Sequence, residues 1–178
     1  MPQAVTHFLI PLILLGLFQD FFVKNKKSFP IQYVFIGGLA GLLPDLDIAV
    51  YYFLSFFGFT IDEVHRTFSH NFFVPLTFVL LGFFFWKFKN KELGKHHLKL
   101  NKIFFVIAFG VFIHILLDPL FYGTITPFYP ISTFSFGFNL INLFPSAWQG
   151  TILPTIDAIL LILWMIYLEV KHKISDFI

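Results

Sequence analysis

Long apolar segments separated by short polar ones make up most of the chain. Five runs have the length and apolar character of membrane-spanning helices, at about residues 8–23, 31–57, 70–88, 103–122 and 152–170. A helix needs about 20 apolar residues to cross a bilayer, so the first run is slightly short and the second can span with tilt. The pattern predicts an all-α, polytopic membrane protein in which residues 1–178 form a single integral membrane domain.

Two segments depart from the simple helical pattern. In the second run, Gly37, Gly38 and Gly41 have no side chain to keep a neighbouring helix away, so they favour close packing. Pro44 follows them and favours a kink, because it lacks a backbone N–H. Residues 123–152 carry no charged side chain, and we interpret them as an interfacial aromatic belt or a re-entrant segment. A lid over a lipid substrate is the sharper alternative for this segment.

The basic residues predict how the helices are oriented. Of the 12 Lys and Arg residues, 11 lie in the segments 24–27, 87–102 and 171–173, and Arg66 alone lies elsewhere. Five spans place these three segments on one side of the membrane, which the positive-inside rule makes the cytoplasmic side. We therefore expect the N-terminus outside, the C-terminus in the cytoplasm, and the protein in the cytoplasmic membrane.

Composition supports a membrane protein and limits its chemistry. The chain is 57% hydrophobic and only 12% charged, whereas soluble domains have about 45–50% apolar and about 25% charged residues. The basic segments are short and explained by topology, so we expect membrane lipid and no nucleic acid as a partner. The chain has no Cys, so a metal would be held by His and carboxylate, which suits zinc or manganese.

Ionisable residues interrupt the apolar runs at comparable depth. A charge at the centre of a bilayer costs about 3 kcal/mol even by insertion scales, so such residues usually have a function or a partner. Asp45 lies 14 residues after Ile31, and Asp118 lies 14 residues after Phe104, both counted from near the predicted cytoplasmic end of the run; this is about 21 Å at the rise of a helix. We expect a metal site in the outer leaflet that is built from His7, Asp45, Asp47, His65, His70, His114 and Asp118.

The spacing within this set indicates how it could hold a metal. His114 and Asp118 are four residues apart, so both lie on one face of a helix. Asp45 and Asp47 are two apart, and either Pro-induced distortion lets both reach the site or only one of them is a ligand. Histidine and aspartate together match a zinc centre without Cys. Arg66 suits a phosphate or carboxylate, because its guanidinium pairs with two oxygens.

Each of these residues also has an ordinary structural explanation. His7 by itself would be read as an interfacial residue, and Asp45 as a helix cap after a kink. Arg66 could form a loop ion pair of little energetic value. Asp157, near the outer end of the last helix, is read first as a helix cap and second as a residue that orients a metal ligand. Because the ionisable residues converge at one depth, a shared metal site explains them better than an independent structural role for each.

Four motifs in register resemble a known family. THFLIPLILLG, GLLPDLD, HRTFSH and HILLDPLFYGTITPFYP occur in this order over roughly residues 6–130. They resemble the YdjM-like family of membrane-bound, metal-dependent hydrolases, which is in turn similar to the zinc-dependent phospholipase C superfamily. The resemblance implies an all-helical fold with a multi-zinc site built from His and Asp. The additional external His ligands of a third zinc are not evident in this sequence, so we expect one or two metal ions.

The resemblance also assigns residues. It makes the seven His and Asp residues above the polar signature of the family, and it adds Gly123 and Pro127 as turn residues after the fourth helix. One position departs from the family pattern: Ser69 stands where Thr is usual, which keeps the hydroxyl group.

These observations predict a membrane-embedded, metal-dependent hydrolase of a phosphoester or lipid head group, with its site on the outer side of the cytoplasmic membrane. Arg66 would hold the phosphoryl oxygens, and His65 or His70 would act as a general acid and not as a ligand. The alternative is a transporter or an ion-binding membrane protein that uses the same Asp and His residues. The sequence leaves the substrate, the number of metal ions and the oligomeric state open.

Overall fold

The computed structural model describes residues 4–65, 68–87, 92–94 and 97–173. Its α-helices, in chain order, are α1 (Ala4–Phe21), α2 (Ile31–Ala40), α3 (Asp47–Leu54), α4 (Ile61–Val64), α5 (Phe73–Lys87), α6 (Leu100–Phe121) and α7 (Ser146–His172). Short 3₁₀ helices are η1 (Lys26–Ser28), η2 (Pro44–Leu46), η3 (Ser55–Phe57) and η4 (Leu140–Leu143). The strands β1 (Glu92–Leu93) and β2 (Leu98–Lys99) pair antiparallel between α5 and α6.

The helices confirm the predicted all-α membrane architecture. Among the described residues, α1, α6 and α7 are each long and apolar enough to cross a membrane. The stretch from α2 through η3 meets the same criteria as a pair of helices bent by 46°. Helix α5 has 15 residues, or a length of about 22 Å. Five spans and their orientation remain predictions.

The kink predicted at Pro44 is present: α2 ends before Gly41, and the chain resumes as η2 at Pro44, which has no N–H to donate. Two predicted boundaries differ from the structure. Helix α1 starts at Ala4, so His7 lies inside it and not before it. Helix α7 starts at Ser146, directly after Pro145, and takes up the last residues of the segment that we expected to be a loop.

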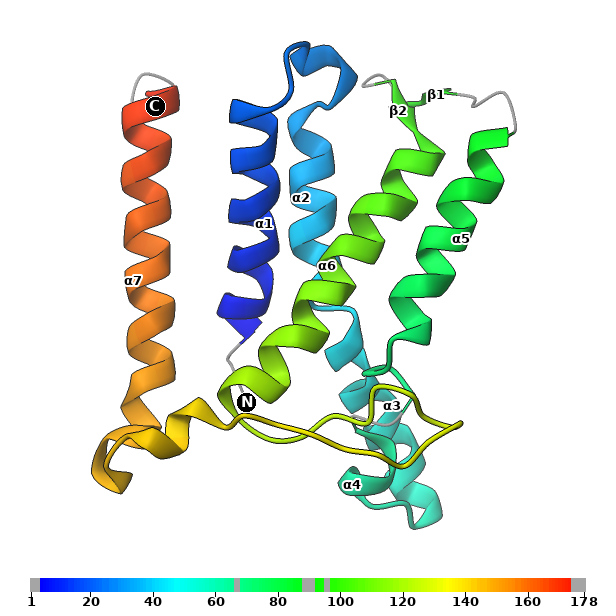
Figure 1. Cartoon of the computed structure of the whole chain (residues 1–178), viewed down its shortest axis with the longest axis vertical. Coiled ribbons are helices and arrows are strands. Elements are labelled where there is room, and N and C mark those ends of the chain that lie inside the picture. Colours follow the sequence, from blue (N-terminus) through cyan, green and yellow to red (C-terminus); the bar gives the residue numbers. More distant parts are fainter. Residues whose placement is uncertain (1–3, 66–67, 88–91, 95–96, 174–178) are drawn as a thin grey trace.

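Helices α1, α2 and α6 pack together (Figure 1), and glycines at their contacts allow the backbones to approach closely. A Cβ atom on Gly110 would lie 2.3 Å from the carbonyl oxygen of Gly37, and one on Gly41 would lie 2.1 Å from the carbonyl oxygen of His7. A side chain at either position would therefore force two helices apart. The predicted role of the glycines of α2 is confirmed. The buried core of this unit consists of Leu12, Leu15, Tyr33, Val34 and Val106.

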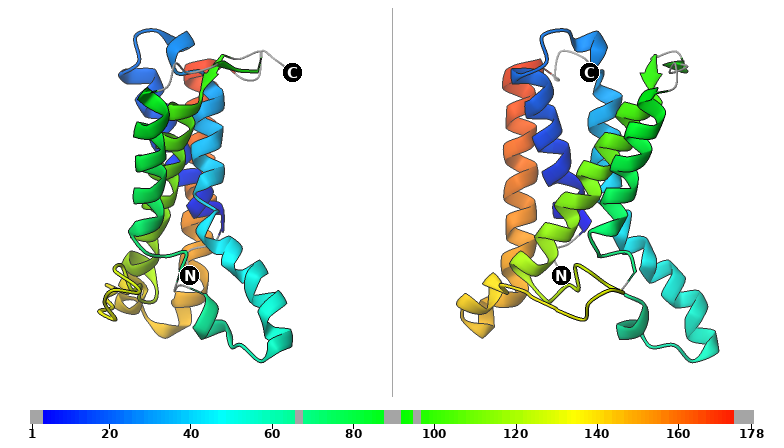
Figure 2. Two further views of the ribbon diagram at one scale, coloured as in Figure 1. Left: turned by 90° about the vertical axis from the view of Figure 1, so that its right-hand side faces the viewer. Right: turned by 45° about the vertical axis from the view of Figure 1, so that its right-hand side comes forward.

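The ends of the molecule differ in character. The segment after α1, the β1–β2 hairpin and the end of α7 gather at one end, whereas α3, α4 and the segment between α6 and α7 lie at the other (Figures 1 and 2). The first end carries the basic segments, and following the predicted orientation we call it the inner end and the other the outer end. Helix α7 stands beside α1 and buries few side chains, among them Leu153 and Asp157.

Candidate metal centre

Four separate parts of the chain meet at the outer end of the bundle. Helix α1 contributes His7, α6 contributes His114 and Asp118, and the segment before α5 contributes His70; the side chains of all four are completely buried. The break between α2 and α3 contributes the two remaining aspartates. The side chain of Asp45 is the most open, with 22% of its surface exposed. Access to the cluster is therefore from the side of α3.

Three of the imidazoles are held through the same ring nitrogen. His114 Nδ1 lies 2.6 Å from the carbonyl oxygen of Gly41, so it donates its proton there. His65 Nδ1 lies 2.7 Å from Asp47 Oδ1, which can only accept. Ser69 Oγ donates to Asp47 Oδ2 at 2.5 Å and therefore accepts from His70 Nδ1 at 2.8 Å. Each neutral ring then has a lone pair on Nε2.

The Nε2 atoms of His70 and His114 face each other and two carboxylates. His70 Nε2 and His114 Nε2 are 3.1 Å apart. Asp118 Oδ2 lies 3.3 Å from the first and 3.8 Å from the second, and Asp45 Oδ1 lies 3.6 Å and 3.5 Å from them. His7 stacks on His114 with 3.8 Å between ring centroids, and its Nε2 is 3.3 Å from Asp118 Oδ1. Lone pairs and carboxylates in such proximity repel one another unless a cation or protons lie between them.

The arrangement fits a divalent cation. Three overlapping sets have ligand atoms within 4.8 Å of one another, namely His7–Asp45–His114, Asp45–His65–His70 and His70–His114–Asp118. Several buried atoms make no hydrogen bond to the described part of the chain, including His7 Nδ1, Asp45 Oδ1 and His65 Nε2. Nitrogen and oxygen donors without sulfur suit zinc or manganese. Ligating imidazoles usually donate their second nitrogen to a carbonyl or carboxylate, as His114 and His65 do here.

Three carboxylates surround His70. Asp45 Oδ1 and Asp118 Oδ2 lie 3.6 Å and 3.3 Å from its Nε2, and Asp47 Oδ2 lies 3.3 Å from its Nδ1. Negative charge from three sides would attract a metal ion to this position.

The geometry separates the roles of the two neighbouring aspartates. Asp45 belongs to two of the three candidate ligand sets. Asp47 instead bonds to His65 and Ser69, and its Oδ2 is 3.3 Å from His70 Nδ1. Because η2 ends between them and α3 begins at Asp47, the two carboxylates point to different sides of the cluster. The position of Asp47 is that of a residue that orients ligands.

The structure brings together all seven predicted His and Asp residues, whereas Arg66 lies outside the described residues. Gly123 and Pro127 occur in turns as expected: Gly123 has a positive φ of 96° and donates its N–H to Asn139 Oδ1, and the carbonyl of Pro127 accepts from Phe72 N. The sequence did not reveal the carbonyl of Gly41 as a partner of His114. The close-packing glycines were the feature of the sequence that could have indicated this approach of the backbone to α6.

Asp157 does not cap a helix, because it lies well inside α7. Its side chain is buried and accepts a hydrogen bond from the hydroxyl of Thr6, the neighbour of His7. Its other oxygen, Oδ2, makes no hydrogen bond to the described residues. Asp157 thus links α7 to the turn of α1 that carries His7.

Fold and cluster together define an all-helical integral membrane protein with a buried His/Asp site that could hold a metal ion. The sequence model of a family described as YdjM inner membrane protein matches residues 1–174, and the chain belongs to this family. The predicted family and the predicted location in the cytoplasmic membrane are therefore confirmed. No curated protein and no solved structure matches the chain. Hydrolase activity and the likeness to phospholipase C stay predictions.

Proposed function

We propose that this protein is a metal-dependent hydrolase that binds one or two divalent cations at the His/Asp cluster and cleaves a phosphoester on the outer side of the membrane. The observation that carries the proposal is the common orientation of His65, His70 and His114. Their Nδ1 atoms are occupied by oxygen partners, and the Nε2 atoms of His70 and His114 face Asp45 and Asp118. A cluster that served only structure would pair donors with acceptors.

His7, Asp45, His70, His114 and Asp118 would hold the metal. A divalent cation bound there would act as a Lewis acid and lower the pKa of water to near 7. Asp45 belongs to two ligand sets and is the residue best placed to be shared if two ions bind. Zinc is the expected ion, with manganese as the alternative.

His65 is the residue proposed to move protons. Asp47 holds its Nδ1 at 2.7 Å, and its Nε2 makes no hydrogen bond to the described residues. A carboxylate at Nδ1 fixes the tautomer of the ring and orients its Nε2. In hydrolysis, the oxygen of water bonds to phosphorus as the ester P–O bond breaks. His65 Nε2 would accept the proton of water or return one to the leaving oxygen.

Arg66 follows His65 directly and would pair with the phosphoryl oxygens. This role rests on the sequence, since Arg66 lies outside the described residues.

The test is metal-dependent release of phosphate or alcohol by the detergent-purified protein. Wild type is stripped with a chelator, reloaded with zinc or manganese, and assayed on p-nitrophenyl phosphate, bis(p-nitrophenyl) phosphate and phospholipids. We expect activity only after reloading. His65→Ala should retain metal and lose about 10²–10⁴-fold in kcat, the usual contribution of a general acid or base. Bound metal without turnover of any phosphoester would refute the hydrolase, and absence of metal would favour the transporter alternative.

A further inference from the structure

An apolar pocket adjoins the metal centre on its open side. It has a volume of about 410 Å³, within the range of about 300–1,000 Å³ that is usual for ligand sites. Its apolar lining comes from α3, α4 and the residues that flank them, namely Leu46, Val50, Leu54, Phe59, Val64 and Phe68.

The polar end of this pocket belongs to the metal centre. Asp47 and Ser69 complete the described lining. Asp47 also holds His65, and Ser69 accepts from His70. A molecule in the pocket would therefore have its apolar part between α3 and α4 and its polar part beside the imidazoles.

The segment from α3 to α4, which we call the α3–α4 hairpin, has an aromatic outer surface. Tyr52, Phe53, Phe56 and Phe57 are all exposed, and Phe56 has 88% of its surface accessible. Exposed apolar patches of this kind mark contact with protein or membrane, and aromatic residues concentrate at membrane interfaces. Since the protein is an integral membrane protein, we place this hairpin against lipid. The pocket then opens where lipid molecules are available.

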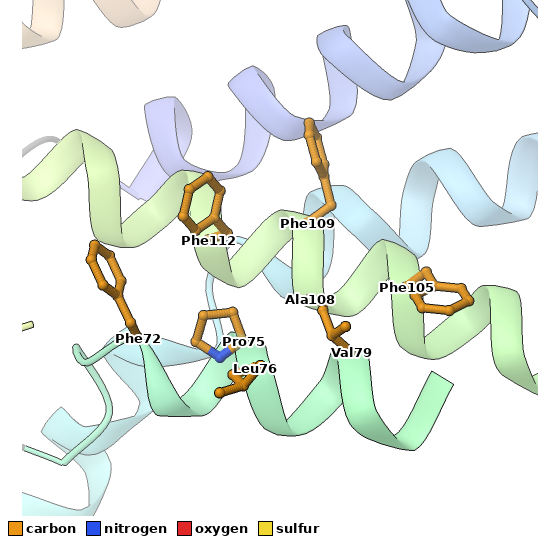
Figure 3. A pocket seen from close by; sticks show the side chains of 8 residues that line it. All are labelled: Phe72, Pro75, Leu76, Val79, Phe105, Ala108, Phe109 and Phe112. Carbon is orange, nitrogen blue, oxygen red and sulfur yellow. The ribbon is translucent and has the colours of Figure 1, made fainter. Parts of the chain in front are cut away.

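A second pocket provides a comparison, because its described lining is apolar and lies away from the metal centre. It has about 400 Å³ and lies between α5 and α6, where its described lining, including Phe72, Leu76, Phe105 and Phe112, carries no charge (Figure 3). It resembles an ordinary lipid-facing groove between two helices. The pocket at α3 differs because one end reaches polar residues of the metal centre.

Building on the proposed function, we infer that the pocket at α3 and α4 receives an acyl chain of the lipid whose phosphoester head group lies at the metal centre. The substrate class is then a membrane lipid and not a water-soluble phosphoester. The apolar pocket beside Asp47 holds the acyl chain, and the imidazole cluster beside it provides the chemistry.

Photolabelling in nanodiscs tests the inference without requiring turnover. The probe is phosphatidic acid with a diazirine near the end of one acyl chain, diluted into phosphatidylcholine around the metal-loaded protein. After irradiation, proteolysis and mass spectrometry locate the labelled peptide. We expect label within residues 46–69. Label confined to α5 and α6 would overturn the inference and leave the proposed function standing.

Two variants should block the pocket. Val50→Trp and Leu54→Trp would each fill it, and labelling within residues 46–69 should fall by about tenfold, since the acyl methylenes lose their apolar surroundings. The matched control is Leu76→Trp in the α5–α6 groove, where 48% exposure is close to the 52% of Val50. Only variants that elute as monodisperse protein are compared. Unchanged labelling in both pocket variants would contradict the inference.

A second probe separates a substrate from an ordinary bound lipid. Diacylglycerol with the same diazirine chain lacks the phosphate, and Asp118→Ala weakens the metal site. Stronger labelling by phosphatidic acid than by diacylglycerol, reduced in Asp118→Ala, would support the inference. Equal labelling by both probes would overturn it, because the pocket would then bind lipid without regard to the head group. Elemental analysis of the same wild-type sample reports separately whether the proposed metal site exists.

Discussion

Two polar clusters, at opposite ends of the molecule, both bury a carboxylate but differ in the groups that surround it. At the inner end, the carboxylate of Asp20 accepts from Lys26 Nζ at 2.5 Å, from the hydroxyl of Tyr167 at 2.7 Å, and is 2.9 Å from His172 Nε2. Donors and acceptors match, and the contacts tie α1 to α7. At the outer end, the ring nitrogens of His70 and His114 are 3.1 Å apart with carboxylates around them.

The difference teaches how a ligand site can be told from a structural ion pair. Burial of a carboxylate is common to both clusters, since the Asp20 and Asp118 side chains have only 4% and 0% of their surface exposed. Among the residues that the structure describes, the outer cluster differs because imidazole Nε2 atoms and carboxylates face one another: Asp45 Oδ1 lies 3.6 Å from His70 Nε2 and 3.5 Å from His114 Nε2, and it makes no hydrogen bond to this part of the chain. An arrangement of this kind is stable only with protons or a cation in place.

The largest expected effect is a loss of bound metal when the outer cluster is changed, but not when the inner cluster is changed. Asp118→Ala removes a carboxylate shared by His7, His70 and His114, and should weaken metal binding by more than about 100-fold, beyond the usual effect of losing an orienting residue. Asp20→Asn, at the other cluster, should retain the metal of the wild type. Elemental analysis of purified proteins measures both. Full metal content in Asp118→Ala would remove the distinction between the clusters.

A smaller effect is expected inside the outer cluster. In the proposed site, Asp47 orients the ligand His70 through Ser69 and is not itself a ligand, so Asp47→Asn should weaken metal binding by about 10–100-fold. Asp45→Asn should cost more, since it removes a ligand. Competition with a chelating dye gives the affinities. The reverse order would assign the ligand role to Asp47.

Helix packing sets the position of the outer cluster and should respond to a single methyl group. Gly110→Ala would place a Cβ 2.3 Å from the carbonyl of Gly37, and should destabilise by about 1–3 kcal/mol through overpacking. Gly150→Ala in α7 meets nothing within 4 Å and should be neutral or stabilising by up to about 1 kcal/mol. Thermal unfolding in detergent compares them. Equal stability of the two variants would show that the helices adjust freely.

The smallest effect concerns the inner cluster. Tyr167→Phe removes one of the hydrogen bonds to Asp20 and should cost about 1 kcal/mol of stability. Metal content and affinity should stay unchanged, because the change lies at the far end of α1 and α7. Unfolding and elemental analysis on one preparation test both parts. Loss of metal would show that the two clusters are coupled through these helices.

Much of the fold could be predicted because hydropathy acts locally. A long apolar run is stable as a helix in lipid whatever the rest of the chain does. The membrane class, the approximate helices and the close-packing role of the glycines of α2 therefore followed from the residues alone. Boundaries were less accurate. The kink at Pro44 followed from the residue itself, but the exact ends of α2 and α3 did not, and α7 begins at Ser146, inside the uncharged segment 123–152.

The sequence by itself determined which residues meet at the outer end, because charges in apolar segments are costly and occur at one depth. Only the tertiary structure decided how they face one another. His114 Nδ1 is held by the carbonyl of Gly41, which lies 73 positions away just after α2, and His65 and His70 are arranged through Asp47 and Ser69. The division between Asp45 and Asp47 has the same origin. Such orientations depend on contacts between distant segments, and the order of residues along one segment does not encode them.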